Sequence, residues 1–217
     1  MRVHTVFVVR TGARAKALEV LMVQAGFHVA AAGPPAPRID AFDERARDRV
    51  SELFGALSEQ TPVPPLRPGA WDLAFADGLV VELDEELHFN RYRARTLQLS
   101  WASDLPWHDT YLVHCREREP ECLAAGRWGK RWTNPSSESM FGASGRPGML
   151  DGTGSPRWKQ RALYDGMKDV MALHSATLRL CRLSVWDQIG GVSLGDVLAG
   201  AELEPAELSQ LVARRTI

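Results

Sequence analysis

Residues 71–95 read WDLAFADGLVVELDEELHFNRYRAR, and this stretch decides the fold. Asp77 and Gly78 form a strong two-residue hairpin signal between two runs of hydrophobic residues. The pattern therefore predicts a β-hairpin with strands at 72–76 and 79–84. Side chains alternate between the two faces of a strand, so Glu82 and Asp84 share one face.

The hairpin suggests a group of acids. Folding the two strands together can bring Asp72 close to Glu82 and Asp84. Three converging carboxylates repel one another and lose solvation, and a hard divalent cation is the usual remedy. We therefore expect Mg²⁺ or Mn²⁺ here, which would polarise a phosphodiester oxygen and lower the pKa of a bound water. The alternative is an exposed strand end that leads into the acidic first turn of a helix.

Helical character returns from His88 to Trp101. In the first turn of this expected helix, His88 can serve as a general base, a metal ligand or a phosphate contact. Arg91 and Arg95 follow at helical spacing, so both can share a face with His88 and bind a phosphate backbone. Arg93 is expected to point elsewhere.

The run from Asp72 to Leu97 resembles the metal-binding core of PD-(D/E)XK (restriction-endonuclease-like) nucleases, in particular the very-short-patch-repair-like endonuclease relatives. In these relatives the second hairpin strand reads E-x-D-G-x-x-H, which Glu82, Asp84 and His88 match, with Glu85 in the glycine position. The resemblance implies an α/β fold, with a mixed central sheet flanked by helices, and a Mg²⁺ or Mn²⁺ cofactor. It also implies a set of catalytic residues: Asp72, Glu82, Asp84 and His88.

The resemblance implies two further roles and shows one departure. The upstream helix of the family often supplies another acid, which makes Glu52 a fourth candidate metal ligand beside Asp72, Glu82 and Asp84. A weaker likeness at 162–185, where a helix leads into a strand, makes Lys168 a candidate substrate contact. The family's catalytic lysine position holds Asp84, so the ExK form is replaced by ExD.

A chain of 217 residues is expected to form a single domain around this core. Hydrophobic periodicity predicts amphipathic helices at 43–60 and 161–174 and a strand at 178–185. The expected core therefore covers 43–102 and 158–187. Residues 103–157, rich in Trp, Gly, Pro and Ser, are expected to be a loop-rich insertion with one helix around 110–125.

The two ends of the chain are expected to extend this core. Residues 1–40 suggest a βαβ-like extension, with a strand at 5–9, a helix at 13–24 and a strand at 27–31. Residues 188–217 are expected to form short helices at 193–198 and 205–214.

The formal net charge of −1 gives no general attraction to nucleic acid, so DNA binding would depend on local charge. Local cations do occur outside the hairpin region, although solvated surface residues are the alternative reading: Arg127, Lys130, Arg131, Arg157, Lys159 and Arg161. Five tryptophans can stack on unpaired bases, or pack within the insertion: Trp101, Trp107, Trp128, Trp132 and Trp158.

Cysteine usage indicates a reducing compartment. Cys115, Cys122 and Cys181 form no CxxC pair, and no apolar stretch approaches ~20 residues, so we expect a cytoplasmic protein. A zinc site that combines Cys115 and Cys122 with nearby histidines, His108 and His114, is an alternative to core or surface roles.

These patterns lead to an expected function. We expect a Mg²⁺- or Mn²⁺-dependent endonuclease that acts on DNA in defence or repair. The main alternative is a catalytically inactive nuclease-like module that binds nucleic acid or a protein partner, and a homodimer is a further alternative. A third reading is an enzyme of another class that uses the same acids on small phosphate-bearing substrates.

Overall fold

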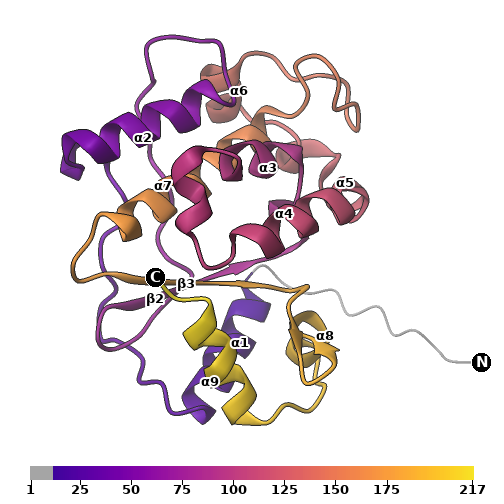
Figure 1. Ribbon diagram of the computed structural model, residues 1–217. Coiled ribbons are helices and arrows are strands. Elements are labelled where there is room, and N and C mark those ends of the chain that lie inside the picture. Colours follow the sequence, from indigo (N-terminus) through magenta and orange to yellow (C-terminus); the bar gives the residue numbers. More distant parts are fainter. Residues whose placement is uncertain (1–11) are drawn as a thin grey trace, which may run out of the picture.

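The computed structural model describes residues 12–217 and centres on a three-stranded sheet (Figure 1). The middle strand, β2 (Leu79–Asp84), pairs antiparallel with β1 (Leu73–Ala74) and parallel with β3 (Arg179–Ser184). The sheet is therefore mixed, and the chain has the α/β composition that the sequence predicts. The expected strand at 5–9 lies outside the described residues.

The Asp77-Gly78 turn confirms the predicted hairpin. Both residues have left-handed backbone, with φ of 58° at Asp77 and 71° at Gly78, and the Leu79 N–H donates to the Ala76 carbonyl at 3.3 Å. A Cβ at Gly78 would lie 2.1 Å from the carbonyl oxygen of Thr177, just before β3. Glycine is therefore required there both by the turn and by the close approach of the neighbouring chain.

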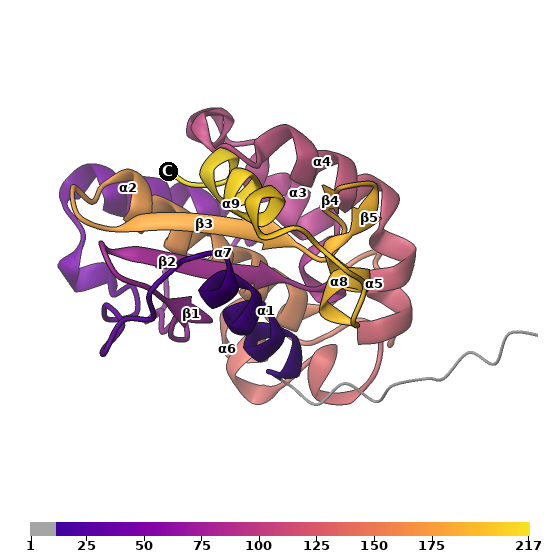
Figure 2. The same ribbon diagram turned by 90° about the horizontal axis from the view of Figure 1, so that it is seen from below.

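Helices cover both faces of the sheet (Figures 1 and 2). One face carries α1 (Ala13–Gln24), α8 (Leu194–Leu198) and α9 (Pro205–Arg214), which confirms the three helices predicted there. The other face carries a larger helical layer: α2 (Glu44–Gly55), α3 (Arg91–Leu97), α4 (His108–Glu117), α5 (Glu119–Gly126), α6 (Pro135–Phe141) and α7 (Pro156–Leu173).

Strand alternation gives each face its own core. Val80 and Leu180 belong to the apolar core of the larger helical layer, whereas Val81 and Leu183 belong to the core beneath α1 and α9. Residues two apart on a strand point the same way, so Glu82 and Asp84 of β2 follow Val80 and face α7. The larger helical layer therefore receives charged side chains from the sheet.

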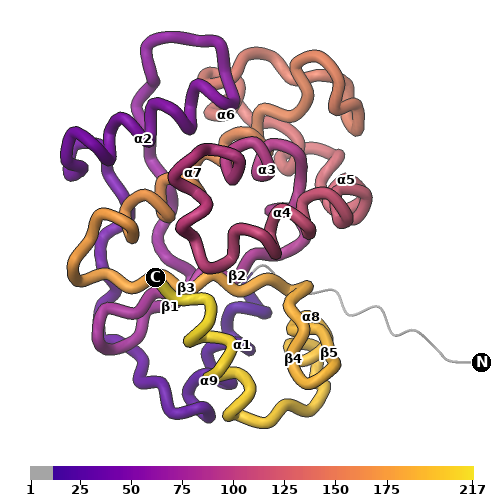
Figure 3. Tube along the Cα trace, viewed as in Figure 1, coloured from indigo at the N-terminus to yellow at the C-terminus, as the bar shows by residue number. Residues whose placement is uncertain are grey.

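Helix α7 is the crossover that makes the parallel pair possible. The chain leaves β2, passes through α3 to α6, returns as α7 and then enters β3 (Figure 3). The sequence predicted both this helix and the strand after it. The helix α2, predicted at 43–60, starts with Asp43 as its N-cap, whose side chain accepts from the Ala46 N–H at 2.7 Å.

The segment 103–157 is more helical than its composition suggested, although α4 and α5 occupy the stretch around 110–125 where one helix was expected. It contains α4, α5 and α6, and Trp107 and Trp132 are buried in the core of the larger helical layer. Asn134 and Ser137 form a capping box that starts α6. Buried indole rings and local capping thus organise a segment in which periodicity is weak.

The helical character expected from His88 to Trp101 is present but divided among short helices, and His88 is not in the first turn of α3. His88 ends the short 3₁₀ helix η2 (Glu86–His88), and Asn90 then caps α3 by accepting from the N–H groups of Tyr92 and Arg93. An N-cap side chain that begins a new helix breaks the expected helical run. The chain continues into a second 3₁₀ helix, η3 (Ser100–Asp104).

The remaining elements are small. The strand expected at 27–31 is reduced to one bridge between Val29 and Phe75, so the βαβ-like extension is not complete in residues 12–217. Two further 3₁₀ helices and a small hairpin complete the chain: η1 (Ile39–Ala41), η4 (Gly129–Arg131), β4 (Gln188–Ile189) and β5 (Val192–Ser193). Along residues 12–217, no helix combines the length and the apolar character needed to cross a bilayer.

The contact between α2 and α7 generates a stability prediction. Replacing a helix-interior glycine with alanine ordinarily stabilises a helix by up to ~1 kcal/mol. At Gly166, however, the new Cβ would lie 2.6 Å from Cδ2 of Leu53, a fully buried side chain. We expect Gly166→Ala to lower the free energy of unfolding by about 1–3 kcal/mol, because overpacking outweighs the gain in propensity.

Urea denaturation followed by circular dichroism measures this change. Gly55→Ala at the end of α2 is the matched control, since a Cβ there meets no atom within 4 Å. A Gly166→Ala protein as stable as the Gly55→Ala protein would show that α2 and α7 are less tightly packed.

Candidate functional site

Charged side chains gather where β2 and β3 meet α7, inside an otherwise apolar layer. Glu82 and Asp84 lie on β2, and Arg182 is paired with Glu82 in the register of the two parallel strands. On α7, spacings of three and four residues place further charged groups on one helix face. These groups are Asp165, Lys168 and Asp169. All six side chains belong to residues that are at most 7% exposed.

Lys168 and Glu82 form a buried ion pair at one end of this group of six charged residues. The Lys168 Nζ lies 2.7 Å from Glu82 Oε1 and also donates to the carbonyl of Ala70 at 2.8 Å. The backbone N–H of Asp72 donates to Glu82 Oε1 at 3.2 Å, and the Asp72 carboxylate accepts from the Leu83 N–H at 3.0 Å. Asp72 itself is exposed, so the group reaches the surface there.

Asp84, His88 and Asp165 form a second group at the C-terminal end of β2, which we call the Asp–His–Asp cluster. The Nδ1 atom of His88 lies 3.0 Å from Asp84 Oδ1 and 2.9 Å from Asp165 Oδ2. One potential ligand atom from each residue lies within 4.8 Å of the others. The two carboxylates are buried, whereas 22% of the His88 side chain is exposed, so the cluster opens to solvent at the histidine.

Arg182 joins the cluster to α7. Its Nη1 donates to both carboxylate oxygens of Asp84, at 2.9 and 2.8 Å, and its Nε donates to Asp169 Oδ1 at 2.6 Å. Its Nη2 donates to the backbone carbonyl of Asp165 at 2.9 Å. The second carboxylate oxygen of Asp169 accepts from Arg93 Nη2 at 2.7 Å. Arg182 is therefore held on three sides.

The charges in this network nearly cancel. Three carboxylates face two guanidinium groups, those of Arg93 and Arg182, which leaves one negative charge. Protonation of His88 removes that charge. A buried network tolerates little net charge, because an unpaired ion in a low-dielectric interior costs several kcal/mol. The cluster therefore needs one positive charge at or next to His88.

The pKa values reflect this need. Burial acts to lower the pKa of His88, but the carboxylates of Asp165 and Asp84 outweigh it and raise the pKa to about 9. Burial acts to raise the pKa of Asp165, yet His88 and Arg182 bring it down to about 2. At Glu82 burial prevails over the attraction of Lys168, and the pKa rises to about 7. The imidazole of the Asp–His–Asp cluster therefore has a pKa well above neutral pH, whereas the carboxyl group of Glu82 has a pKa near neutral pH.

The structure separates the acids that were expected to share one ion. Asp84 belongs to the Asp–His–Asp cluster, whereas Asp72 and Glu82 lie with Lys168. Glu52 lies on the exposed side of α2, and among residues 12–217 the group of side chains able to hold a metal does not include it. The reason is strand alternation combined with α7: the helix inserts Lys168 beside Glu82 and Asp165 beside Asp84.

The arginines also differ from expectation. Arg91 and Arg95 do not share a helix with His88, since Asn90 begins α3 after it. Arg91 is paired with Glu119, 2.8 Å from its Nη2, and Arg95 lies over the ring of Tyr92 at 5.7 Å. Arg93, which was expected to have no role, is buried against Asp169.

Sequence reasoning missed Asp165, Asp169 and Arg182 as parts of the site. A signal was present for each. Three charges at spacings of three and four inside the amphipathic run 161–174 indicate a buried polar face, and Arg182 alternates with Leu180 and Ser184 at inward positions of its strand. A charged residue at an inward position requires a buried partner.

Comparison with known proteins gives one match. A family model described as "Family of unknown function (DUF7255)" matches residues 52–200, which is more than half of the chain. No curated protein and no solved structure matches the chain. The matched segment contains every residue of the Asp–His–Asp cluster together with Glu82, Lys168 and Arg182.

The Arg93–Asp169–Arg182 contacts generate a stability prediction. Asp169→Asn removes the carboxylate that pairs with two buried guanidinium groups, so we expect the free energy of unfolding to fall by about 3–5 kcal/mol. Glu119→Gln breaks the partly exposed pair with Arg91 and should cost less than about 1 kcal/mol. Chemical denaturation of the two variants measures both values. Equal costs would mean that the buried network does not stabilise the fold.

The raised pKa of His88 generates a pH prediction. A folded-state pKa of about 9 against an unfolded value of 6.5 means that protonated His88 stabilises the fold fully below pH 6.5. This contribution, about 3 kcal/mol, is lost as the pH rises to about 9. We expect the His88→Gln variant, measured metal-free in the presence of a chelator, to show no such loss of stability as the pH rises from 6.5 to about 9. Denaturation curves at several pH values measure it, and parallel profiles for parent and variant would contradict it.

Proposed function

We propose that this chain, which belongs to the family of unknown function DUF7255, is a metal-dependent phosphodiester hydrolase that cleaves DNA as an endonuclease. The observation that carries the proposal is the Asp–His–Asp cluster, in which two buried carboxylates and one partly exposed imidazole converge at the end of a central strand. Pathways that need such cleavage include defence and repair.

The donor set fits a divalent ion. His88 Nδ1 lies 2.9–3.0 Å from one oxygen of each aspartate, a spacing close to that of neighbouring ligands around an octahedral ion with bonds of about 2.1 Å. One nitrogen and two carboxylate oxygens suit Mn²⁺ better than Mg²⁺, which prefers oxygen donors. We therefore propose Asp84, His88 and Asp165 as the holders, with Mn²⁺ preferred over Mg²⁺. When bound, such an ion polarises a phosphoryl oxygen and lowers the pKa of water.

The surrounding residues prepare these holders. Arg182 fixes both oxygens of Asp84 and the backbone of Asp165, so the Asp84 carboxylate and the main chain at Asp165 are held in place before a substrate arrives. Glu82, with a pKa of about 7, is suited to take up a proton at neutral pH. Lys168 holds that carboxylate in place and supplies positive charge beside it.

Lys168 also supports the likeness to PD-(D/E)XK nucleases. The motif position for the family's lysine is occupied by Asp84, but Lys168 of α7 places an ammonium group 2.7 Å from Glu82. The acid–acid–lysine set of Asp72, Glu82 and Lys168 is thus assembled from a hairpin and a crossover helix. We propose a restriction-endonuclease-like core on this basis, with Arg91 and Arg95 as DNA contacts at its border.

One observation favours a second candidate, a non-catalytic nuclease-like module that binds nucleic acid or a protein. Asp84 already accepts two hydrogen bonds from Arg182, and protonated His88 alone neutralises the network. In such a module the cluster would be a structural ion network, and metal binding would be absent.

Metal titration and cleavage assays separate the two candidates. We expect the parent to bind Mn²⁺ in isothermal titration and to nick supercoiled DNA in the presence of Mn²⁺. His88→Gln and Asp165→Asn should lose saturable binding and lower cleavage by at least about 100-fold, because each removes one ligand. Glu52→Gln is the matched control, since this exposed acid lies outside the cluster, and it should behave as the parent does.

Circular dichroism of each variant confirms that it is folded before cleavage is compared. A parent that binds no Mn²⁺ and cuts no DNA would support the non-catalytic module. Cleavage that survives in folded His88→Gln and Asp165→Asn proteins would show that the reaction does not use the Asp–His–Asp cluster.

A further inference from the structure

Trp128 is exposed, whereas neighbouring tryptophans of the larger helical layer are buried. Its exposed fraction is 63%, whereas Trp107, Trp132 and Trp158 are at most 1% exposed. An indole ring left largely in water is a large apolar surface, and such rings are used for contact with ligands. The ring lies directly after α5, in the connection to η4.

Cations without acidic partners precede and follow Trp128 in the chain. The guanidinium of Arg127 lies over the Trp128 ring at 5.3 Å, and Arg131 donates to the carbonyl of Ala125 at 3.0 Å. Within residues 12–217, Arg127, Lys130 and Arg131 take part in no ion pair, and the stretch 122–137 contains no acidic residue. We call Arg127, Trp128, Lys130 and Arg131 the Trp128 surface.

Helix capping explains only part of this charge. The C-terminal end of α5 is partly negative, and the contact of Arg131 with Ala125 satisfies one of its free carbonyls. This role accounts for Arg131. It requires neither Lys130 nor an exposed ring at Trp128.

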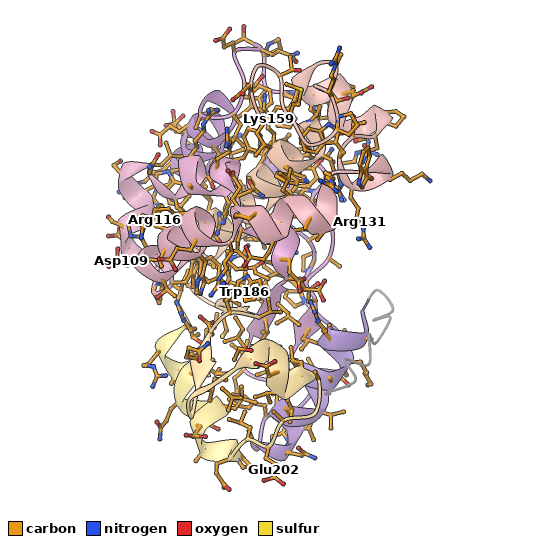
Figure 4. All side chains as sticks on the ribbon, turned by 90° about the vertical axis from the view of Figure 1, so that its right-hand side faces the viewer. Asp109, Arg116, Arg131, Lys159, Trp186 and Glu202 are labelled. Atoms are coloured by element: carbon orange, nitrogen blue, oxygen red, sulfur yellow. The ribbon has the colours of Figure 1, made fainter. Side chains whose placement is uncertain are left out.

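The helix that leads into the Trp128 surface ends against the residue before His88. A Cβ at Gly126, the last residue of α5, would lie 2.6 Å from Leu87 and 3.1 Å from Trp158. Leu87 precedes His88, and its carbonyl accepts from Arg161 of α7 at 3.3 Å. Helix α5 therefore ends against η2, which carries His88. Figure 4 shows Arg131 at one edge of the helical layer, with Asp109 and Arg116 at the opposite edge.

We propose that the Trp128 surface binds an unpaired segment of nucleic acid, with a base stacked on the indole and the adjacent phosphates held by Arg127, Lys130 and Arg131. An exposed ring can stack only on a base whose face is free, and in a duplex both faces are covered by neighbouring bases. The inference rests on the proposed nuclease function in one respect: it makes single-stranded or frayed DNA the substrate that reaches His88.

Binding is tested apart from cleavage. Fluorescence anisotropy with a labelled oligonucleotide of about 12 nucleotides, in EDTA, reports binding by the whole chain. We expect the parent to bind the single strand more tightly than the matching duplex, and Trp128→Ala to weaken the single-strand complex about 10-fold or more. Met149→Ala is the matched control, because Met149 is also an exposed apolar residue of this segment, at 52%. It should bind as the parent does.

A charge variant and a cleavage variant complete the design. Lys130→Ala should weaken binding and reduce the slope of log affinity against log salt by about 1, as expected for the loss of one phosphate contact. His88→Gln should bind the single strand as the parent does, even though it is expected to lose cleavage. This variant separates failure of the proposed function from failure of the binding inference.

The outcomes are distinct. Trp128-dependent binding of single strands by a parent that never cuts DNA would support this inference and contradict the nuclease. Equal single-strand binding by Trp128→Ala and the parent would overturn the inference, whether or not the parent cuts DNA. Binding of anionic vesicles without binding of oligonucleotides would also overturn it, because the surface would then be a lipid contact.

Discussion

The structure depends on the buried guanidinium of Arg182. It lies between β2 and α7, and its hydrogen bonds to Asp84, Asp169 and the backbone of Asp165 connect the sheet to the crossover helix. A fully buried cation has no water to replace a lost partner, so each acid must keep its position. This requirement fixes where α7 lies on the sheet, and with it the place of every charged side chain of the site.

An apolar contact of the same size would hold α7 to the sheet at lower cost in desolvation. The layer instead keeps nine-tenths-buried charges in its centre and opens them to solvent at two points, Asp72 and His88. Structural stability alone does not require openings of this kind. They lie at the start of the hairpin, beside Glu82, and at the end of β2, within the Asp–His–Asp cluster.

Local patterns predicted the fold better than the site. The hairpin, α1, α7, α9 and β3 follow from turn chemistry and periodicity, which act within a few residues. Within 103–157, one helix was expected around 110–125, where α4 and α5 lie, but α6 was missed because buried tryptophans and local capping, not periodic stripes, organise this segment. Glu82, Asp84 and His88 were singled out from the motif and Lys168 from the weaker likeness at 162–185, but their division into two groups was not foreseen. That division depends on side chains of α7 that approach β2 from a distant part of the sequence.

The parallel pairing of β2 with β3 joins residues far apart in the chain: Asp84 and Arg182 are 98 positions apart. Closing so long a loop costs entropy before any contact rewards it, and contacts of this kind form slowly. The whole helical layer from α3 to α7 must therefore be made before β3 can take its place. A growing chain released at any earlier point therefore carries the hairpin acids without Lys168 and Arg182, the cations that pair with Glu82 and Asp84.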